Sequence, residues 1–154
     1  MNQSFVADFE TTTDPNNCYV WAYAISEVAE HDKIKNIIIG TSIDDFMNWC
    51  RDRKTNDKIF FHNLKFDGQF IINWLFKNGF NHITDNKDRA SKTFTTLISD
   101  KGMWYQIEVV FKLNGKNVKK IIFQDSLKLI PLSVDAIAKS FHLPISKLKL
   151  DYDC

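Results

Sequence analysis

Long apolar runs are missing from this sequence of 154 residues. No hydrophobic stretch approaches the ~20 residues that are needed to span a bilayer. The opening residues, MNQSFVADFE, lack both the charged n-region and the apolar h-region of a secretory signal. We therefore expect neither a membrane partner nor secretion.

Cysteine is scarce, and charges of the two signs nearly balance. The three cysteines (Cys18, Cys50 and Cys154) contain no close pair, so they predict neither a disulfide framework nor a zinc site. This usage favours a reducing, cytoplasmic environment. The formal net charge is only +1, so any nucleic-acid contact must come from local features rather than from bulk charge.

Internal repeats, low-complexity segments and linkers rich in Pro, Gly or Ser are also missing. The length suits one domain with a sizeable core, and we expect a monomer. What the sequence has in abundance is phenylalanine, with thirteen residues. Most of these phenylalanines are expected to fill the core.

Hydrophobic patterns predict an α/β fold: a mixed sheet flanked by helices, with a β-meander in the second half. An RNase H-like architecture is compatible with this order of elements. The expected strands cover residues 5–11, 19–26, 37–39 and 59–61, with a meander from 93 to 124 that turns at 100–102 and 114–115. The expected helices run to residue 53 from a cap at Ser42, from 66 to 78, and from 134 to 141.

The first chemically informative cluster is an acidic pair at the end of an apolar strand. Asp8 and Glu10 are two residues apart, so in a strand they face the same side. Two adjacent carboxylates repel each other, and a hard divalent cation such as Mg²⁺ or Mn²⁺ removes that cost. The alternative is a solvent-facing strand end that carries two ordinary acids.

The second cluster lies where a buried strand gives way to a helix. Asn63 falls in the turn and Asp67 near the helix N-terminus, which is where open α/β sheets place their ligands. Asp67 is therefore a second candidate for a metal site. Its alternative role is that of a helix-capping acid.

Together the two clusters resemble a known family. The strings DFETTTDP (8–15) and FHNLKFDGQFIINWL (61–75) are similar to the first two exonuclease motifs of protein-primed family B DNA polymerases of bacteriophages. The stretch QDSLKLIP (124–131) resembles a single-strand-binding motif of the same domain, and the segments 102–105 and 147–152 fit in order and spacing. The resemblance runs from Val6 to Tyr152.

The resemblance implies an RNase H-like, DnaQ-like domain that hydrolyses the terminal phosphodiester at the 3′ end of single-stranded DNA. Asp8 would bridge two divalent ions (Mg²⁺ or Mn²⁺), Glu10 would bind the ion on the nucleophile side, and Asp67 would hold the second ion. Lys147 matches a family lysine that assists catalysis, and its alternative is a solvated charge. Two ions about 3.5–4 Å apart can activate water and stabilise the leaving oxygen.

The resemblance also implies a set of side chains that hold the single strand through stacking and polar contacts. Core packing is the alternative for the phenylalanines, and a half-buried structural histidine is the alternative for His62. The lysines of the second hairpin favour a solvated surface, and a contact with the DNA backbone is the less favoured alternative. The implied DNA ligands are Thr11, Phe60, His62, Asn63, Phe66, Phe70, Ser126 and Leu127.

One family motif is missing: no Tyr in the sequence is followed four positions later by Asp. We therefore expect an N-terminal fragment of a longer polymerase, or a short phage or prophage gene, with weak nuclease activity on its own. A terminal protein would be a partner of the whole polymerase in the cytoplasm of a bacterial host. The first competing hypothesis is a non-catalytic single-strand-binding module, which would bind DNA without cleaving it. The second is a stand-alone exoribonuclease, which differs from the DNA enzyme in its contacts with the 2′-hydroxyl.

Overall fold

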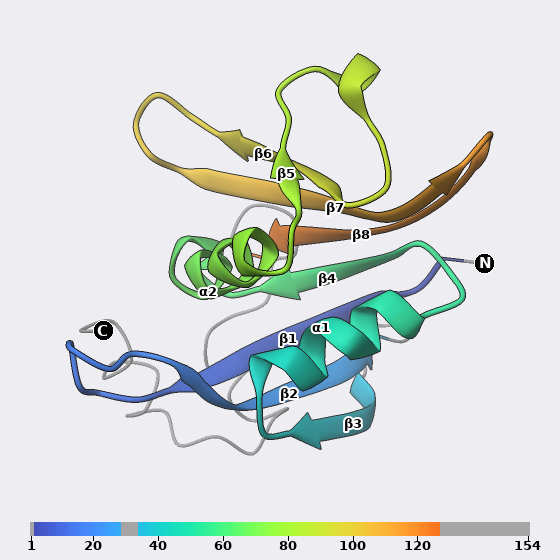
Figure 1. The fold of residues 1–154 in the computed structure, drawn as a ribbon. Helices are drawn as coiled ribbons and strands as arrows, with labels where there is room; N and C mark the ends of the chain where they lie inside the picture. The colour runs from blue at the N-terminus through green and yellow to red at the C-terminus, as the bar shows by residue number, and fades with distance from the viewer. Residues whose placement is uncertain (1, 29–33, 127–154) are drawn as a thin grey trace.

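The computed structural model describes residues 2–28 and 34–126. These residues form one eight-stranded sheet in the order β3-β2-β1-β4-β8-β7-β6-β5, with two helices packed on it (Figure 1). In chain order the elements are β1 (Ser4–Thr11), β2 (Val20–Val28), β3 (Ile34–Gly40), α1 (Ile43–Asp52), β4 (Asp57–Phe61), α2 (Leu64–Lys77), β5 (Asn81–His82), the 3₁₀ turn η2 (Asn86–Asp88), β6 (Thr93–Ile98), β7 (Trp104–Asn114) and β8 (Asn117–Asp125).

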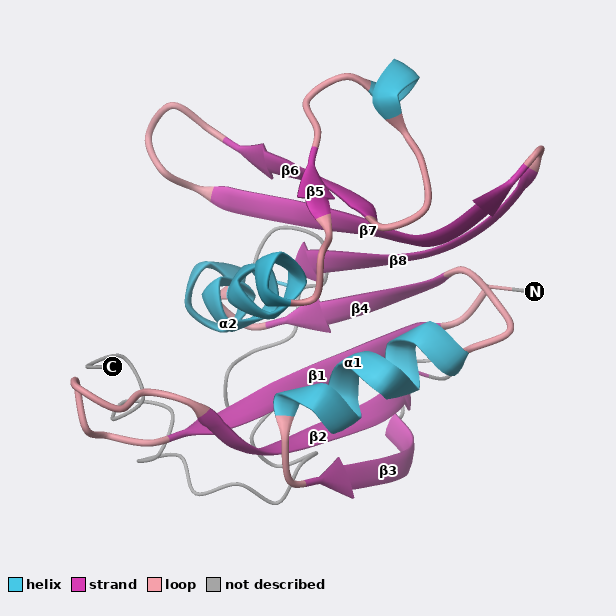
Figure 2. Ribbon diagram, viewed as in Figure 1, coloured by secondary structure: helices cyan, strands magenta, loops and turns pink. Residues whose placement is uncertain are grey.

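Three strands in the middle of the sheet run parallel. β1 pairs in parallel with β4, and β4 pairs in parallel with β8. On one side, β2 pairs antiparallel with β1, and β3 pairs antiparallel with β2. On the other side, β7 pairs antiparallel with β8, and β6 pairs antiparallel with β7. The carboxyl ends of β1, β4 and β8 therefore point to the same side of the molecule (Figure 2).

Both helices cover the same face of the sheet (Figure 1). The interior beneath them is aromatic: the rings of Phe9, Phe46, Phe61 and Phe123 have centroids between 4.9 and 6.1 Å apart. Such tilted and edge-to-face pairs add about 0.5–1.5 kcal/mol each to the burial itself. The prediction of a core rich in phenylalanine is confirmed.

The predicted mixed α/β sheet with a meander is also confirmed. The Ser42 side chain accepts a hydrogen bond from the Asp45 backbone N–H at 3.1 Å, as the capping pattern indicated. The second helix begins at Leu64, two residues earlier than predicted, and β5 and η2 were not predicted. The expected helix at 134–141 lies outside the described residues.

The prediction for the cysteines is wrong at one position. Cys18 is disulfide-bonded, whereas Cys50 is a free thiol buried in α1. No helix within 2–28 and 34–126 has the length and apolar character of a membrane span.

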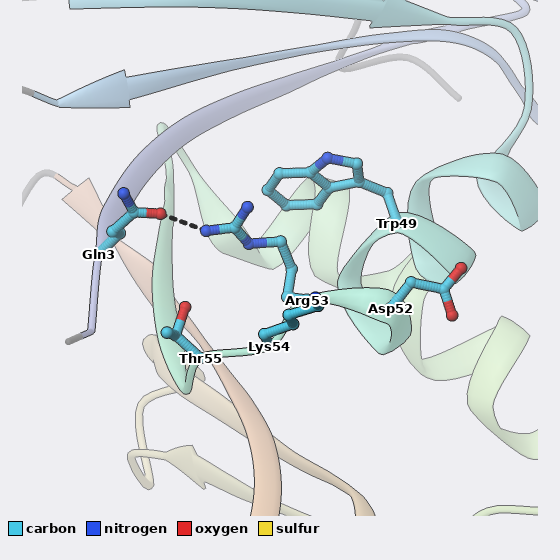
Figure 3. A pocket seen from close by; sticks show the side chains of 6 residues that line it. All are labelled: Gln3, Trp49, Asp52, Arg53, Lys54 and Thr55. Atoms are coloured by element: carbon cyan, nitrogen blue, oxygen red, sulfur yellow. Dashed lines mark hydrogen bonds between the residues drawn. The ribbon is translucent and has the colours of Figure 1, made fainter.

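A cluster of contacts around Arg53 lies at the end of the sheet opposite the carboxyl ends of the parallel strands. The Arg53 guanidinium lies 4.9 Å from the Phe5 ring centroid and 5.1 Å from that of Trp49, and it donates to the Gln3 side chain (Figure 3). Its Nε donates to the buried carboxylate of Asp57 at 2.8 Å. This cluster joins the C-terminus of α1 to the first residues of β1 and β4.

Candidate nucleic-acid and metal site

The candidate site is built from residues at the carboxyl ends of β4 and β8 and from the second half of β1, which runs beside them. Ala7 of β1 is level with Phe61 of β4, and Phe61 is level with Asp125 of β8. One residue further along each strand direction come Asp8, His62 and Ser126. Strand register thus brings three segments that are far apart in the sequence to a single edge, which is where open sheets bind ligands.

Asp8 and Glu10 form the acidic side of this edge. Both are half-buried and alternate with Phe9, which is buried in the core, so the two carboxylates lie on the face of the sheet opposite the helices. Their cross-strand neighbours on β2 are Ala24 and Ala22. The cross-strand partners of both carboxylates on β2 are thus small residues.

Asp67 lies in the first turn of α2 and is only 4% exposed. The helix comes very close to β7 at this turn, because Gly68 follows: a Cβ atom there would lie 3.2 Å from the ring of Trp104. Position 67 is thereby held by close helix–strand packing. The prediction that Asp67 sits near the helix N-terminus is confirmed.

The turn before α2 has an unusual backbone. Asn63 is the N-cap residue, and its φ of 64° and ψ of 66° place it in the left-handed region, which asparagine tolerates better than most residues. Its side chain makes no capping hydrogen bond. Instead the Leu64 backbone N–H donates to Asp125 Oδ1 at 3.0 Å, inside the protein.

His62 lies between two carboxylates at this edge. Burial lowers the pKa of the His62 imidazole, while the charges of Asp125 and Asp8 act in the opposite direction and raise it. The electrostatic influence of both acids on one ring agrees with the strand register. His62 Nδ1 and Ser126 Oγ are buried without a hydrogen-bond partner among the described residues, so two polar atoms at this edge lack protein partners.

The other predicted DNA ligands that the structure describes lie on β1, β4 and α2. Phe66 and Phe70 are half-buried on α2, with ring centroids 5.6 Å apart, and Phe70 also packs against the core. Thr11 and Phe60 are buried. Phe70 thus takes part in core packing, whereas Phe60 is buried outside the core cluster that the helices cover, so its role as a DNA ligand stays a prediction. The predicted residues Leu127 and Lys147 lie outside the described residues.

The donor chemistry of the edge suits hard divalent ions, which prefer carboxylate oxygens. Asp8 and Glu10 supply two carboxylates on one face, beside the small side chains of β2. Within the described part of the chain, however, no three His, Cys, Asp or Glu side chains are grouped closely enough to hold a metal ion. A shared metal site for Asp8, Glu10 and Asp67 therefore stays a prediction.

One residue of this edge was missed by reasoning from the sequence. From the sequence, Asp125 was only one residue of the stretch 124–131 that resembles a single-strand-binding motif. In the structure it caps α2, and its charge acts on the His62 imidazole. A signal did exist: an acid that ends an apolar strand, Ile121 to Phe123, directly before a serine. It became informative only once β8 was known to run parallel to β4.

Comparison with known proteins identifies the class. The family model of DNA polymerase type B, organellar and viral, matches residues 50–154, and the chain belongs to this family. The resemblance to bacteriophage family B polymerases is thereby confirmed. Over 148 residues, which are 96% of the chain, it is 43% identical to the DNA polymerase of Bacillus phage Nf, and the match spans 24% of that relative.

Solved structures agree with this assignment. A structure of phi29 DNA polymerase complexed with single-stranded DNA has a TM-score of 0.74 and 40% identity, over 94% of this chain and 24% of that protein. A structure of the same polymerase complexed with primer-template DNA gives the same values. The chain spans about a quarter of the length of the polymerases that it matches.

Proposed function

We propose that this chain is the 3′–5′ exonuclease domain of a phage type B DNA polymerase, and that it removes nucleotides from the 3′ end of single-stranded DNA. The observation that carries the proposal is the shared edge of β1, β4 and β8, which gathers Asp8, His62 and Ser126 from three distant segments. Membership of a DNA polymerase family makes DNA the expected substrate. The relatives' polymerase activity, a terminal protein partner, a monomeric state and the cytoplasm of a bacterial host are parts of the same proposal.

The chain's own residues divide the work between holding the strand and holding ions. Phe66 and Phe70, adjacent on α2, offer ring faces and edges on which unpaired bases can stack. Asn63, His62 and Ser126 offer polar groups for the backbone of the strand. The solved complex of phi29 DNA polymerase with single-stranded DNA supports this assignment, because that protein has the same fold at 40% identity.

Asp8 and Glu10, with Asp67, would hold two divalent ions in the proposed site. When bound, such ions supply the activation of water and the stabilisation of the leaving 3′-oxygen. The half-buried carboxylate pair would hold the cations, and its cross-strand partners on β2 are alanines. The protein's task is then mainly positioning and electrostatics, as in other phosphoryl transfers.

Metal-dependent stabilisation tests the proposal without requiring turnover. Thermal unfolding of the full chain is measured in EDTA and in increasing Mn²⁺. At a concentration a hundred times its Kd, a bound ion adds about 2.7 kcal/mol, or roughly 5–10 °C in Tm for a chain of this size. Asp8→Asn should abolish this shift, whereas Asp88→Asn, a change of equal charge in the exposed η2 turn, should keep it.

Release of a 3′-terminal label from single-stranded DNA is measured in parallel. We expect slow, Mn²⁺-dependent release that disappears in Asp8→Asn and persists in Asp88→Asn. Binding of DNA with neither a metal shift nor cleavage would refute the nuclease assignment in favour of a non-catalytic binding module. Faster cleavage of RNA than of DNA would instead indicate an exoribonuclease.

A further inference from the structure

The N-terminus of α2 is capped across the sheet rather than by its own N-cap residue. A helix begins with backbone N–H groups that lack intrahelical partners, and an Asn at the N-cap commonly accepts from one of them. Asn63 does not do so, and its backbone adopts a left-handed conformation. The Leu64 N–H is satisfied by Asp125 Oδ1 at 3.0 Å, from the last residue of β8.

This exchange of partners has a consequence for the side chains of the turn. With the Leu64 N–H satisfied from β8, the Asn63 amide group is not used in capping. Burial lowers the pKa of His62, and the negative charge of the same carboxylate partly offsets this lowering. Asp125 therefore contacts the segment 62–64 at its backbone and acts electrostatically on its imidazole, from a strand end that is 5% exposed.

We infer that Asp125 is a positioning residue for DNA binding: it fixes the turn between β4 and α2 so that His62 and Asn63 face the strand. The inference rests on the proposed function, in which these two residues are DNA ligands. A negative carboxylate suits this place, because it also faces the positive end of a helix of 14 residues. Next to it in the chain, the buried Ser126 hydroxyl lacks a partner among the described residues.

The contact that Asp125 makes at this edge is with the turn, because its Oδ1 accepts from the Leu64 N–H. In this inference its effect on DNA binding passes through the turn. This distinguishes Asp125 from Asp8 and Glu10, whose removal should alter the response to metal.

The test compares Asp125→Ala and Asp125→Asn in the full chain. Affinity for a fluorescent oligothymidylate with a free 3′-hydroxyl is measured in EDTA, at a temperature where every variant is folded. Loss of a partner that orients a metal ligand typically costs 10–100-fold in metal affinity or activity, and by analogy we expect about tenfold weaker DNA binding in Asp125→Ala. Asp125→Asn keeps an oxygen acceptor for the Leu64 N–H and should bind close to wild type.

Ser42→Ala is the matched control. It removes the N-cap acceptor of α1, at 3.1 Å from the Asp45 N–H, and destabilises a helix in a comparable way. A merely structural role for Asp125 predicts that Ser42→Ala and Asp125→Ala weaken DNA binding equally, and that result overturns the inference. Unchanged affinity in Asp125→Ala overturns it as well.

Hydrogen exchange of the Leu64 amide separates this inference from the proposed function. Failure of the wild-type chain to bind the oligonucleotide would refute the proposed function alone. The positioning role is then decided by exchange: Asp125→Ala must expose the Leu64 amide and alter the signals of residues 62 and 63, while Asp125→Asn must not. Protection that persists in Asp125→Ala refutes the positioning role whatever the DNA result.

Discussion

Removal of the buried carboxylate of Asp57 should destabilise the protein strongly, although this residue is far from the candidate site. The Asp57 side chain is fully buried, and its oxygens accept from three donors. These are the Gln3 backbone N–H at 2.9 Å, the Thr55 hydroxyl at 2.6 Å and Arg53 Nε at 2.8 Å. The cluster joins the segment 53–57 to Gln3, which is about 50 positions away in the sequence.

The expected loss of stability depends on the Arg53 charge, which loses its ion-pair partner when Asp57 is removed. Breaking a fully buried ion pair by deleting one partner costs about 3–5 kcal/mol. The Arg53 side chain is 25% exposed and keeps its contacts with two aromatic rings and Gln3, so the lower end applies, about 3 kcal/mol for Asp57→Ala. Asp57→Asn keeps an oxygen acceptor but loses a charged hydrogen bond, which costs about 2 kcal/mol.

The cost should also depend on pH in a defined direction. Burial by itself raises the pKa of Asp57, but hydrogen bonds from Thr55, Arg53 and Gln3, together with the charge of Arg53, outweigh it and hold the pKa below its usual value. The carboxylate therefore contributes stability above the unfolded-state pKa of about 3.9 and loses it as the pH falls through the lower folded-state value. The difference between wild type and Asp57→Asn should shrink below about pH 4.

Urea denaturation, followed by tryptophan fluorescence between pH 3 and 7, measures these differences in the free energy of unfolding. Asp52→Asn is the matched control, because Asp52 is 69% exposed and pairs with Arg51 at 3.2 Å. Such surface pairs contribute about 0–1 kcal/mol. The reasoning is refuted by an Asp57→Asn cost no larger than that of Asp52→Asn, or by a difference that grows as the pH falls.

Two further predictions concern the packing under α1. Gly40→Ala should lower the free energy of unfolding in urea by about 3 kcal/mol, because the added Cβ would lie 2.3 Å from atoms of the Tyr23 ring. The loss should be smaller in a Tyr23→Ala background. An equal loss in both backgrounds would contradict the clash. Burial lowers the pKa of Lys119, whose Nζ donates to the Cys50 carbonyl at 3.1 Å. The free energy of unfolding of wild type should therefore rise relative to that of Lys119→Met as the pH rises toward about 10. A difference between the two proteins that does not change with pH would show that burial does not disfavour the charged form of Lys119.

Most of the fold could be predicted from the sequence, because its local signals agree with the final structure. The capping serine of α1 and the Asn114-Gly115 turn both lie where expected, although the central turn residues are Gly115 and Lys116, since Asn114 pairs with Asn117. The start of α2 could not be placed, because Asn63 caps without its side chain. β5 contains only two residues and carries no periodicity.

The site was predicted unevenly for a similar reason. Asp8 and Glu10 could be found because strand alternation places i and i+2 on one face, and Asp67 because a helix start is a local signal. Asp125 depends on a parallel pairing between β4 and β8, whose residues are about 60 positions apart, as the 61-residue separation of its hydrogen-bond partner Leu64 shows. Local patterns do not contain that information.

The residues expected to matter for stability and those proposed to act in function lie toward opposite ends of the parallel strands. The two sets can therefore be tested separately. The Arg53–Asp57 cluster lies where β1 and β4 begin, whereas Asp8 lies in the second half of β1 and Asp125 is the last residue of β8. Substitutions more than 7–10 Å apart without shared partners usually have additive effects. Asp57→Asn should thus lower the stability of the Asp8→Asn and Asp125→Ala proteins by the same amount as that of wild type, while DNA affinity and the response to Mn²⁺ depend only on the changes at the other end.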